Sequence, residues 1–194
     1  VLTGRVFSAK AKTPAGLSDL IDRDIQLMRA YSIGVVFYSD NEYPPLLREV
    51  YDPPFALFYR GNKEVISSSC IAVVGTRRPT GRGMKSAHEL SKELCGLDLT
   101  VVSGLAHGID TYAHRGAVEG MVSCNRGSTA AVLASGLDSI YPAENRKLAS
   151  SILQNGGCLV SEYPPGVPPL KWHFPQRNRI ISGLSEACVV VEAP

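Results

Sequence analysis

The chain has 194 residues, of which 44% are hydrophobic, and its mean hydropathy is +0.02. A chain of this length and balance can bury one sizeable core, and it has no apolar run close to the ~20 residues that cross a bilayer, so we expect no membrane span. The formal net charge of +2 is too small to indicate nucleic-acid binding through bulk charge, so such binding must depend on local clusters of basic side chains.

The cysteine pattern argues against two classes of small protein. The 5 cysteines are scattered and form no CxxC pair, which speaks against a disulfide framework and against a zinc site. The first residues lack the basic, apolar and small-residue regions of a signal peptide. We therefore expect a cytoplasmic protein that holds no metal.

Residues 1–50 are expected to form a small helical region. Apolar residues recur near helical spacing between Leu20 and Met28, which predicts a helix there. Prolines at positions 53 and 54 end the segment, because proline does not continue a helix. The main domain is then expected to occupy residues 51–194.

From Phe55 onward, short apolar runs alternate with helical patterns. Consecutive β–helix–β units of this length predict right-handed crossovers and an α/β fold, with a mostly parallel sheet covered by helices on both faces. The stretch 120–127 is expected to be a surface excursion between a helix and a strand. The expected strands cover residues 55–59, 71–75, 99–103, 128–134, 157–161 and 187–192. The expected helices cover residues 81–96, 108–120, 144–155 and 175–184.

A glycine-rich basic loop follows the strand expected at 71–75. It runs from Gly75 to Gly83 and contains Arg77 and Arg78, whose fork-shaped side chains suit phosphate. Thr80 is well placed to cap the next helix, whose amino terminus attracts anions. The loop matches neither GxGxxG nor GxxxxGK[ST], so it is either an anion-binding loop of another kind or an ordinary strand–helix turn with solvated arginines.

A second loop, from Ser103 to Asp110, follows the next strand. Its small residues Ser103 and Gly104 would let a phosphate approach closely. Asp110 lies just inside the helix amino terminus, where it either contacts a ligand or simply suits the helix dipole. A metal site at His107 and His114 is not expected, because no third ligand has suitable spacing.

A third segment, residues 171–179, interleaves aromatic and basic side chains. Aromatic rings stack on unpaired bases and cations neutralise phosphates, which is what single-stranded nucleic acid requires of a protein. Trp172 is expected to pack a loop onto the sheet. Arg177 and Arg179 point in different directions on one helix, so one of them can bind phosphate while the other holds the core. Two strand-end acids, Glu162 and Glu192, are expected to pair with these arginines.

Taken together, the motifs resemble the DprA/Smf family, the DNA-processing proteins of bacterial natural transformation, or competence. They occur in family order over nearly the whole chain from Tyr43, and they are specific as a set. The matching segments are Val74–Arg77 with Thr80 and Gly83, Ser103–Asp110, Ala113–His114, Val132–Asp138, Ile140–Pro142, Ser161–Gly166, Phe174–Ser185 and Val189–Ala193.

The resemblance implies an extended Rossmann-like domain preceded by a small SAM-like helical segment. It also implies a homodimer that binds single-stranded DNA, protects it from nucleases and helps to load the recombinase RecA, with no catalytic reaction, no catalytic residues and no cofactor. A further strand and helix would follow Pro194. The residues expected to bind DNA or its phosphates, from the motifs and the resemblance together, are Gly75, Thr76, Arg77, Thr80, Gly83, Ser103, Gly104, Lys171, Phe174, Arg177 and Arg179.

Two other functions remain open at this point. A nucleotide-processing enzyme resembling the phosphoribohydrolases would use a related sheet, but the PGGxGTxxE motif is absent and Glu162 is the only acid expected in the pocket. A nicotinamide-dependent dehydrogenase is disfavoured by the missing GxGxxG.

Overall fold

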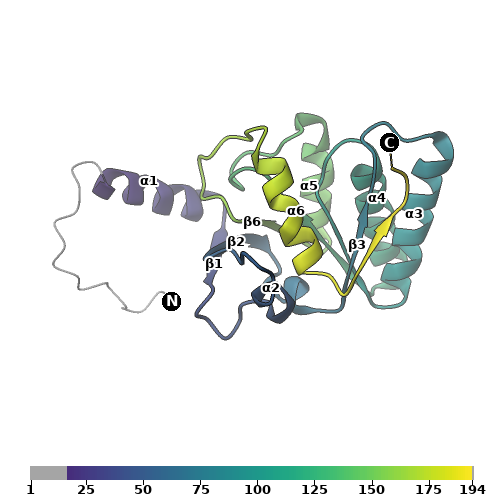
Figure 1. Cartoon of the computed structure of the whole chain (residues 1–194), viewed down its shortest axis with the longest axis horizontal. Coiled ribbons are helices and arrows are strands. Elements are labelled where there is room, and N and C mark those ends of the chain that lie inside the picture. Colours follow the sequence, from purple (N-terminus) through teal and green to yellow (C-terminus); the bar gives the residue numbers. More distant parts are fainter. Residues whose placement is uncertain (1–16, 194) are drawn as a thin grey trace.

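A single sheet runs through the middle of the computed structural model, which describes residues 17–193 (Figure 1). Its strands are β1 (Ile33–Phe37), β2 (Ala56–Gly61), β3 (Cys70–Val74), β4 (Thr100–Ser103), β5 (Ser128–Val132), β6 (Cys158–Ser161) and β7 (Ala187–Val190). Their order in the sheet is β1-β2-β6-β5-β4-β3-β7. Every strand expected after residue 50 is present, and each end lies within two residues of its expected position.

The five strands from β6 to β7 are parallel neighbours, whereas β1 and β2 are antiparallel and form one edge of the sheet. The register places Ile71 of β3 opposite Val101 of β4, and Val101 opposite Thr129 of β5. The predicted mostly parallel α/β sheet is therefore confirmed.

Helices cover both faces of this sheet, as predicted. One face packs against α3, α4 and α5, and the other against α2, η1 and α6 (Figure 1). The helices are α1 (Leu17–Ala30), α2 (Pro45–Arg48), η1 (Lys63–Ser67), α3 (Gly81–Gly96), α4 (Ile109–Cys124), η2 (Ala143–Asn145), α5 (Arg146–Gln154) and α6 (His173–Gly183), of which η1 and η2 are 3-10 helices.

The central strands are short apolar runs because they are covered on both sides. Every residue of β4 and of β5 is buried. A strand buried on both faces needs apolar side chains in both directions, and so it does not alternate between apolar and polar residues. Three free cysteines, Cys70 and Cys158 in strands and Cys95 in α3, are buried in this interior as small apolar side chains.

The helix α4 is longer than expected, because it continues through the stretch 120–124 that was predicted to be a surface excursion. Its last turns lie against α3 at very short distance: a Cβ added at Gly116 would lie 2.0 Å from the His88 carbonyl oxygen. Met121 is buried in the same contact, so the helical conformation continues to bury apolar surface. Asn125 then ends the helix in the left-handed conformation, with φ 51°.

The N-terminal segment is joined to the sheet. Strand β1 pairs with β2, and Tyr43 and Leu47 are buried in the same core as α6. The division into domains at residue 50, and the SAM-like character of the segment before it, stay predictions, and residues 1–16 lie outside the described part of the chain. Within residues 17–193, no helix has the length and apolar character that crossing a membrane requires.

Candidate nucleic-acid interface

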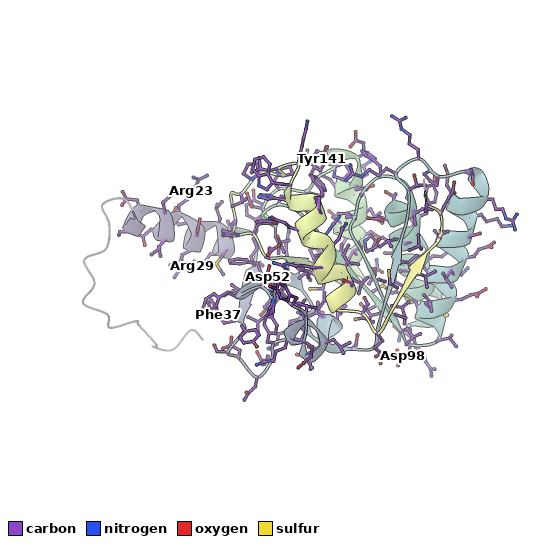
Figure 2. All side chains as sticks on the ribbon, viewed as in Figure 1. Arg23, Arg29, Phe37, Asp52, Asp98 and Tyr141 are labelled. Carbon is purple, nitrogen blue, oxygen red and sulfur yellow. The ribbon has the colours of Figure 1, made fainter. Side chains whose placement is uncertain are left out.

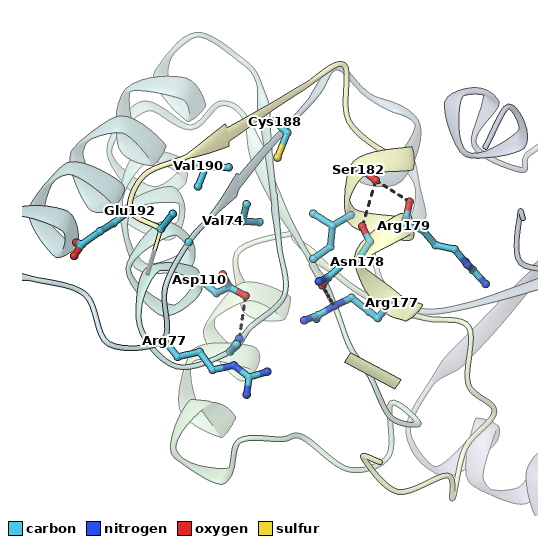
Figure 3. Close-up of a pocket in the computed structure, with 14 residues that line it drawn as sticks. Val74, Arg77, Asp110, Arg177, Asn178, Arg179, Ser182, Cys188, Val190 and Glu192 are labelled. Carbon is cyan, nitrogen blue, oxygen red and sulfur yellow. Dashed lines mark hydrogen bonds between the residues drawn. The ribbon is translucent and has the colours of Figure 1, made fainter. Parts of the chain in front are cut away.

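The predicted binding loops lie where the strand order reverses. Strand β3 is followed in the chain by β4 on one side, whereas β7, which is last in the chain, lies on its other side. In open parallel sheets, ligands bind outside the carboxyl ends of the strands at such a reversal, because the loops diverge there and leave a crevice. A cavity of about 590 Å³ occupies this crevice, between β3, β7 and α6 (Figure 3).

The first loop begins at Gly75, immediately after β3, and is held close to its neighbours. The Thr76 amide donates to the Glu192 carbonyl oxygen at 2.7 Å, and the Thr76 carbonyl oxygen accepts from the Ile109 amide at 3.1 Å. A Cβ at Gly75 would lie 2.7 Å from the same Glu192 carbonyl oxygen, so glycine permits this close approach. Arg77 and Arg78 follow with exposed side chains.

A carboxylate of the same chain, that of Glu192, lies at the amino terminus of α3. Thr80 caps the helix as predicted, accepting from the Gly83 amide at 3.1 Å. The Thr80 amide and hydroxyl both donate to the Glu192 carboxylate, each at 3.1 Å from Oε2. The expected pairing of Glu192 with an arginine is therefore wrong. The Glu192 carboxylate thus occupies the amino terminus of α3, where a phosphate was expected to bind at Thr80 and Gly83.

The second loop is fixed by buried hydrogen bonds. The Ser103 hydroxyl donates to the Val73 carbonyl oxygen at 2.7 Å, and the Gly104 amide donates to Asp110 Oδ2 at 3.1 Å. Asp110 is buried, and burial raises the pKa of its carboxyl group, an effect that the nearby positive charge of Arg177 opposes. Ser103, Gly104 and Asp110 thus shape the loop, and Ser103 and Gly104 are both buried in this conformation.

Arg177 lies in the interior, with only 4% of its surface exposed. Its Nη1 donates to the Gly104 carbonyl oxygen at 2.7 Å and also to the Val132 carbonyl oxygen. Its Nε donates to Asn178 Oδ1 at 3.2 Å, as Figure 3 shows. The guanidinium therefore ties α6 to the ends of β4 and β5. Burial lowers its pKa, and the charge of Asp110 opposes that shift.

Arg179 points in a different direction from Arg177, as its position on the helix predicts (Figure 3). It pairs with Glu162, as expected, and its Nε lies 3.3 Å from Asp52 Oδ2. The side chain thus connects α6 to the segments that follow α2 and β6. Arg177 and Arg179, whose roles the sequence left open, therefore both make structural contacts within the chain.

At the surface of the site, the exposed side chains of Arg77 and Tyr141 form a cluster with the half-buried side chain of Phe174. The Arg77 guanidinium lies over the Phe174 ring, 5.2 Å from its centroid, which is a cation–π contact. The Tyr141 ring meets the Phe174 ring edge-on at a centroid distance of 5.8 Å. A small hollow of about 30 Å³ lies among these three side chains, bordered also by Pro169. Figure 2 shows Tyr141 at the edge of the molecule that holds the carboxyl ends of the parallel strands.

Two further exposed residues precede α6. Lys171 is exposed as expected, but the prediction that Trp172 packs a loop onto the sheet is wrong, because 61% of Trp172 is exposed. Its ring meets the His173 ring edge-on, with a centroid distance of 6.0 Å. His173 itself is buried and stacks on Tyr163, which fixes the start of the helix.

The charge of this surface is locally positive. Arg77, Arg78, Arg82 and Lys171 are exposed, and among residues 17–193 none of these four side chains pairs with a carboxylate. Unpaired guanidinium groups remain available for an external anion. Of the three side chains in the cluster with Phe174, Arg77 and Phe174 were named as candidates from the sequence, whereas Tyr141, which stands outside the glycine-rich and basic segments, was not.

Known proteins are similar to this chain over most of its length. A family model described as DNA recombination-mediator protein A matches residues 34–194. The chain is 41% identical over 173 residues to the DNA processing protein DprA of Bacillus subtilis and 42% identical over 173 residues to that of Streptococcus pneumoniae, covering 89% of this chain and 56% and 57% of the relatives. It is 44% identical over 156 residues to protein Smf of Escherichia coli, covering 80% of this chain and 40% of that protein. The chain thus spans about half the length of the curated relatives that it matches.

Two solved structures share the fold. The X-ray structure of DprA from Streptococcus pneumoniae superposes with a TM-score of 0.74 at 38% identity, covering 93% of this chain and 62% of that one. DNA processing protein A from Helicobacter pylori, whose structure was described for a unique mode of binding single-stranded DNA, gives 0.74 at 30% identity, covering 84% and 70%. These matches confirm the Rossmann-like fold. Since the family model spans most of the chain, the protein belongs to the family of DNA recombination-mediator protein A, the DprA/Smf family that its motifs indicate.

Proposed function

We propose that the chain binds single-stranded DNA without regard to sequence, through the cluster of Arg77, Phe174 and Tyr141 with Lys171 beside it. The observation that carries this proposal is the contact between Arg77 and Phe174, 5.2 Å from guanidinium to ring centroid. Arg77 has no carboxylate partner within residues 17–193. A guanidinium binds a phosphate in bidentate fashion, and an aromatic ring stacks on any base. Such a pair recognises the features that every unpaired nucleotide shares.

The chemistry of the cluster favours a single strand over a duplex. In a duplex the faces of the bases are stacked on one another, so Phe174 and Tyr141 would have nothing to stack on. The Helicobacter pylori relative, which binds single-stranded DNA, supports the same assignment for this chain. We extend the proposal to the family role: a cytoplasmic homodimer that protects incoming DNA and helps to load RecA during transformation and recombination.

The alternative of a nucleotide-processing enzyme finds less support. Glu162, the acid that such an enzyme would need, pairs with Arg179, and its side chain is only 15% exposed. Asp110 and Glu192, the two acids that line the cavity, also have partners already: Asp110 accepts two backbone amides, and Glu192 accepts from the Thr80 amide and hydroxyl. These three acids are therefore engaged in contacts within the chain, which disfavours each of them as a general acid or base.

Fluorescence anisotropy of a labelled oligo-dT tests the proposal, compared with a matched duplex across a salt series. If about four phosphates are neutralised, the slope of log affinity against log salt should lie near −3, from ~0.7 for each phosphate. Arg77→Ala should reduce the slope to about −2 and lower the affinity roughly 10- to 150-fold, which corresponds to one charge-assisted hydrogen-bonded contact.

Arg78→Ala is the matched control, because Arg78 is exposed on the same loop but lies outside the contact with Phe174. Loss of an exposed charge of this kind should lower the affinity by at most about fivefold. Binding that does not respond to salt, or that survives Arg77→Ala, would contradict the proposal. The rate of RecA filament formation on the same oligonucleotide, with the wild type and with Arg77→Ala, then tests the loading role.

A further inference from the structure

Glu192 accepts hydrogen bonds from both ends of the loop 76–80, which contains Arg77. At one end, the Glu192 carbonyl oxygen accepts from the Thr76 amide at 2.7 Å. At the other end, the Glu192 carboxylate accepts from the Thr80 amide and the Thr80 hydroxyl, each at 3.1 Å. Arg77 and Arg78 lie between these two points. A single residue just after β7 thus closes the loop that presents the arginine.

The carboxylate also fits the place that it occupies. A Cβ added at Gly83 would lie 2.0 Å from Glu192 Oε2, so only glycine lets the carboxylate approach the first turn of α3. The unpaired backbone amides of that turn carry a partial positive charge, which the carboxylate offsets. A phosphate of DNA could bind at this helix terminus only by displacing a partner that is already in place.

We propose that Glu192 is a positioning residue, which holds the loop 76–80 in the conformation that keeps the Arg77 guanidinium over Phe174, and that the phosphate binds at Arg77 and not at the terminus of α3. This inference rests on the proposed function for its effect on DNA, but the loop geometry itself does not depend on DNA. It also revises the expectation that Thr80 and Gly83 contact phosphate: both serve to seat Glu192.

A double-mutant cycle with Arg77 tests the proposal, using the same oligo-dT anisotropy assay. Glu192→Ala should lower the affinity about two- to tenfold, as expected for the loss of one or two ordinary hydrogen bonds. In the Arg77→Ala background the same change should have no further effect, because Glu192 acts through Arg77. Glu192→Gln should restore affinity close to the wild type, since its amide oxygen still accepts from Thr80.

Glu186→Ala is the matched control, because it removes the same charge from the other end of β7, where the side chain is exposed. It should leave the affinity unchanged. If phosphate instead binds at the terminus of α3, Glu192→Ala and Glu192→Gln will both tighten binding, and the salt slope will steepen by about 0.7. That result would overturn the proposal, as would equal losses in the wild-type and Arg77→Ala backgrounds.

A measurement without DNA separates this inference from the proposed function. Trypsin cleaves after an exposed arginine in a mobile loop, and Pro79 blocks cleavage after Arg78, so cleavage after Arg77 reports the order of the loop. Glu192→Ala should raise the rate of that cleavage several-fold, whereas Glu192→Gln and Glu186→Ala should not. If the wild type fails to bind DNA, this assay still decides the role of Glu192. An unchanged cleavage rate in Glu192→Ala would refute it.

Discussion

We predict that the buried guanidinium of Arg177 stabilises the fold and does not contact DNA. Arg177→Met keeps most of the volume and removes the charge. The substitution leaves the Gly104 and Val132 carbonyl oxygens without the donor that they share, and it leaves the Asp110 carboxylate without its opposing charge. Each buried acceptor without a partner costs about 1–3 kcal/mol, so the two carbonyl oxygens together cost about 2–6 kcal/mol.

We therefore expect Arg177→Met to lower the free energy of unfolding by about 4 kcal/mol, which is a large part of the 5–15 kcal/mol typical of a domain. At ~2–4 °C for each kcal/mol in a protein of this size, Tm should fall by about 8–16 °C. Urea unfolding followed by circular dichroism measures the first quantity, and a thermal scan measures the second.

Arg179→Met provides the comparison, because its side chain is 27% exposed and pairs at the surface of the helix. Its cost should be smaller, about 1–2 kcal/mol. Below the transition, folded Arg177→Met should bind oligo-dT with the salt slope of the wild type. A cost under 1 kcal/mol, or a slope reduced by about 0.7, would show that Arg177 faces the DNA and not the core.

Two further predictions concern the interior. Gly116→Ala should lower the free energy of unfolding by about 2 kcal/mol, because the overlap with the His88 carbonyl oxygen at 2.0 Å outweighs the ~1 kcal/mol that alanine gains in a helix. Gly81→Ala should be neutral or slightly stabilising, since an added Cβ would meet nothing within 4 Å. Equal effects of the two substitutions in urea unfolding would refute this. Burial lowers the pKa of His114 to about 3, so between pH 3 and ~6.5 the unfolded chain binds a proton that the folded chain does not, and stability is lost as the pH falls. Relative to His114→Gln, the wild type should lose about 2 kcal/mol between pH 7 and pH 5, and a constant difference would contradict the assignment.

Much of the sheet could be predicted from the sequence, because strands buried on both faces appear as short apolar runs between glycine loops. Arg77 and Phe174 could be named as candidate binding residues, because Arg77 stands in a basic glycine-rich loop and the family resemblance assigns a DNA contact to both positions. The length of α4 was missed, although Asn125 offered a signal: asparagine often ends a helix in the left-handed conformation.

Other parts of the site leave no local trace in the sequence. The burial of Arg177 depends on where α6 crosses the ends of β4 and β5, and an arginine in a basic segment reads the same whether it faces solvent or core. Tyr141 reaches Phe174 from a loop 33 positions earlier in the chain, outside any basic segment. The partner of Thr80 is 112 positions away, and sequence spacing alone does not connect two such residues.

That last separation has a consequence for how the protein is made. The ribosome releases Thr80 long before Glu192, and at 5–20 residues per second the interval of 112 residues lasts roughly 6–22 s. Throughout this time β3 has no β7 beside it, and the Arg77 loop lacks the contacts that close its two ends. The Arg77 loop, which we propose as the DNA-binding loop, thus becomes ordered only after the strand next to β3 has emerged from the ribosome.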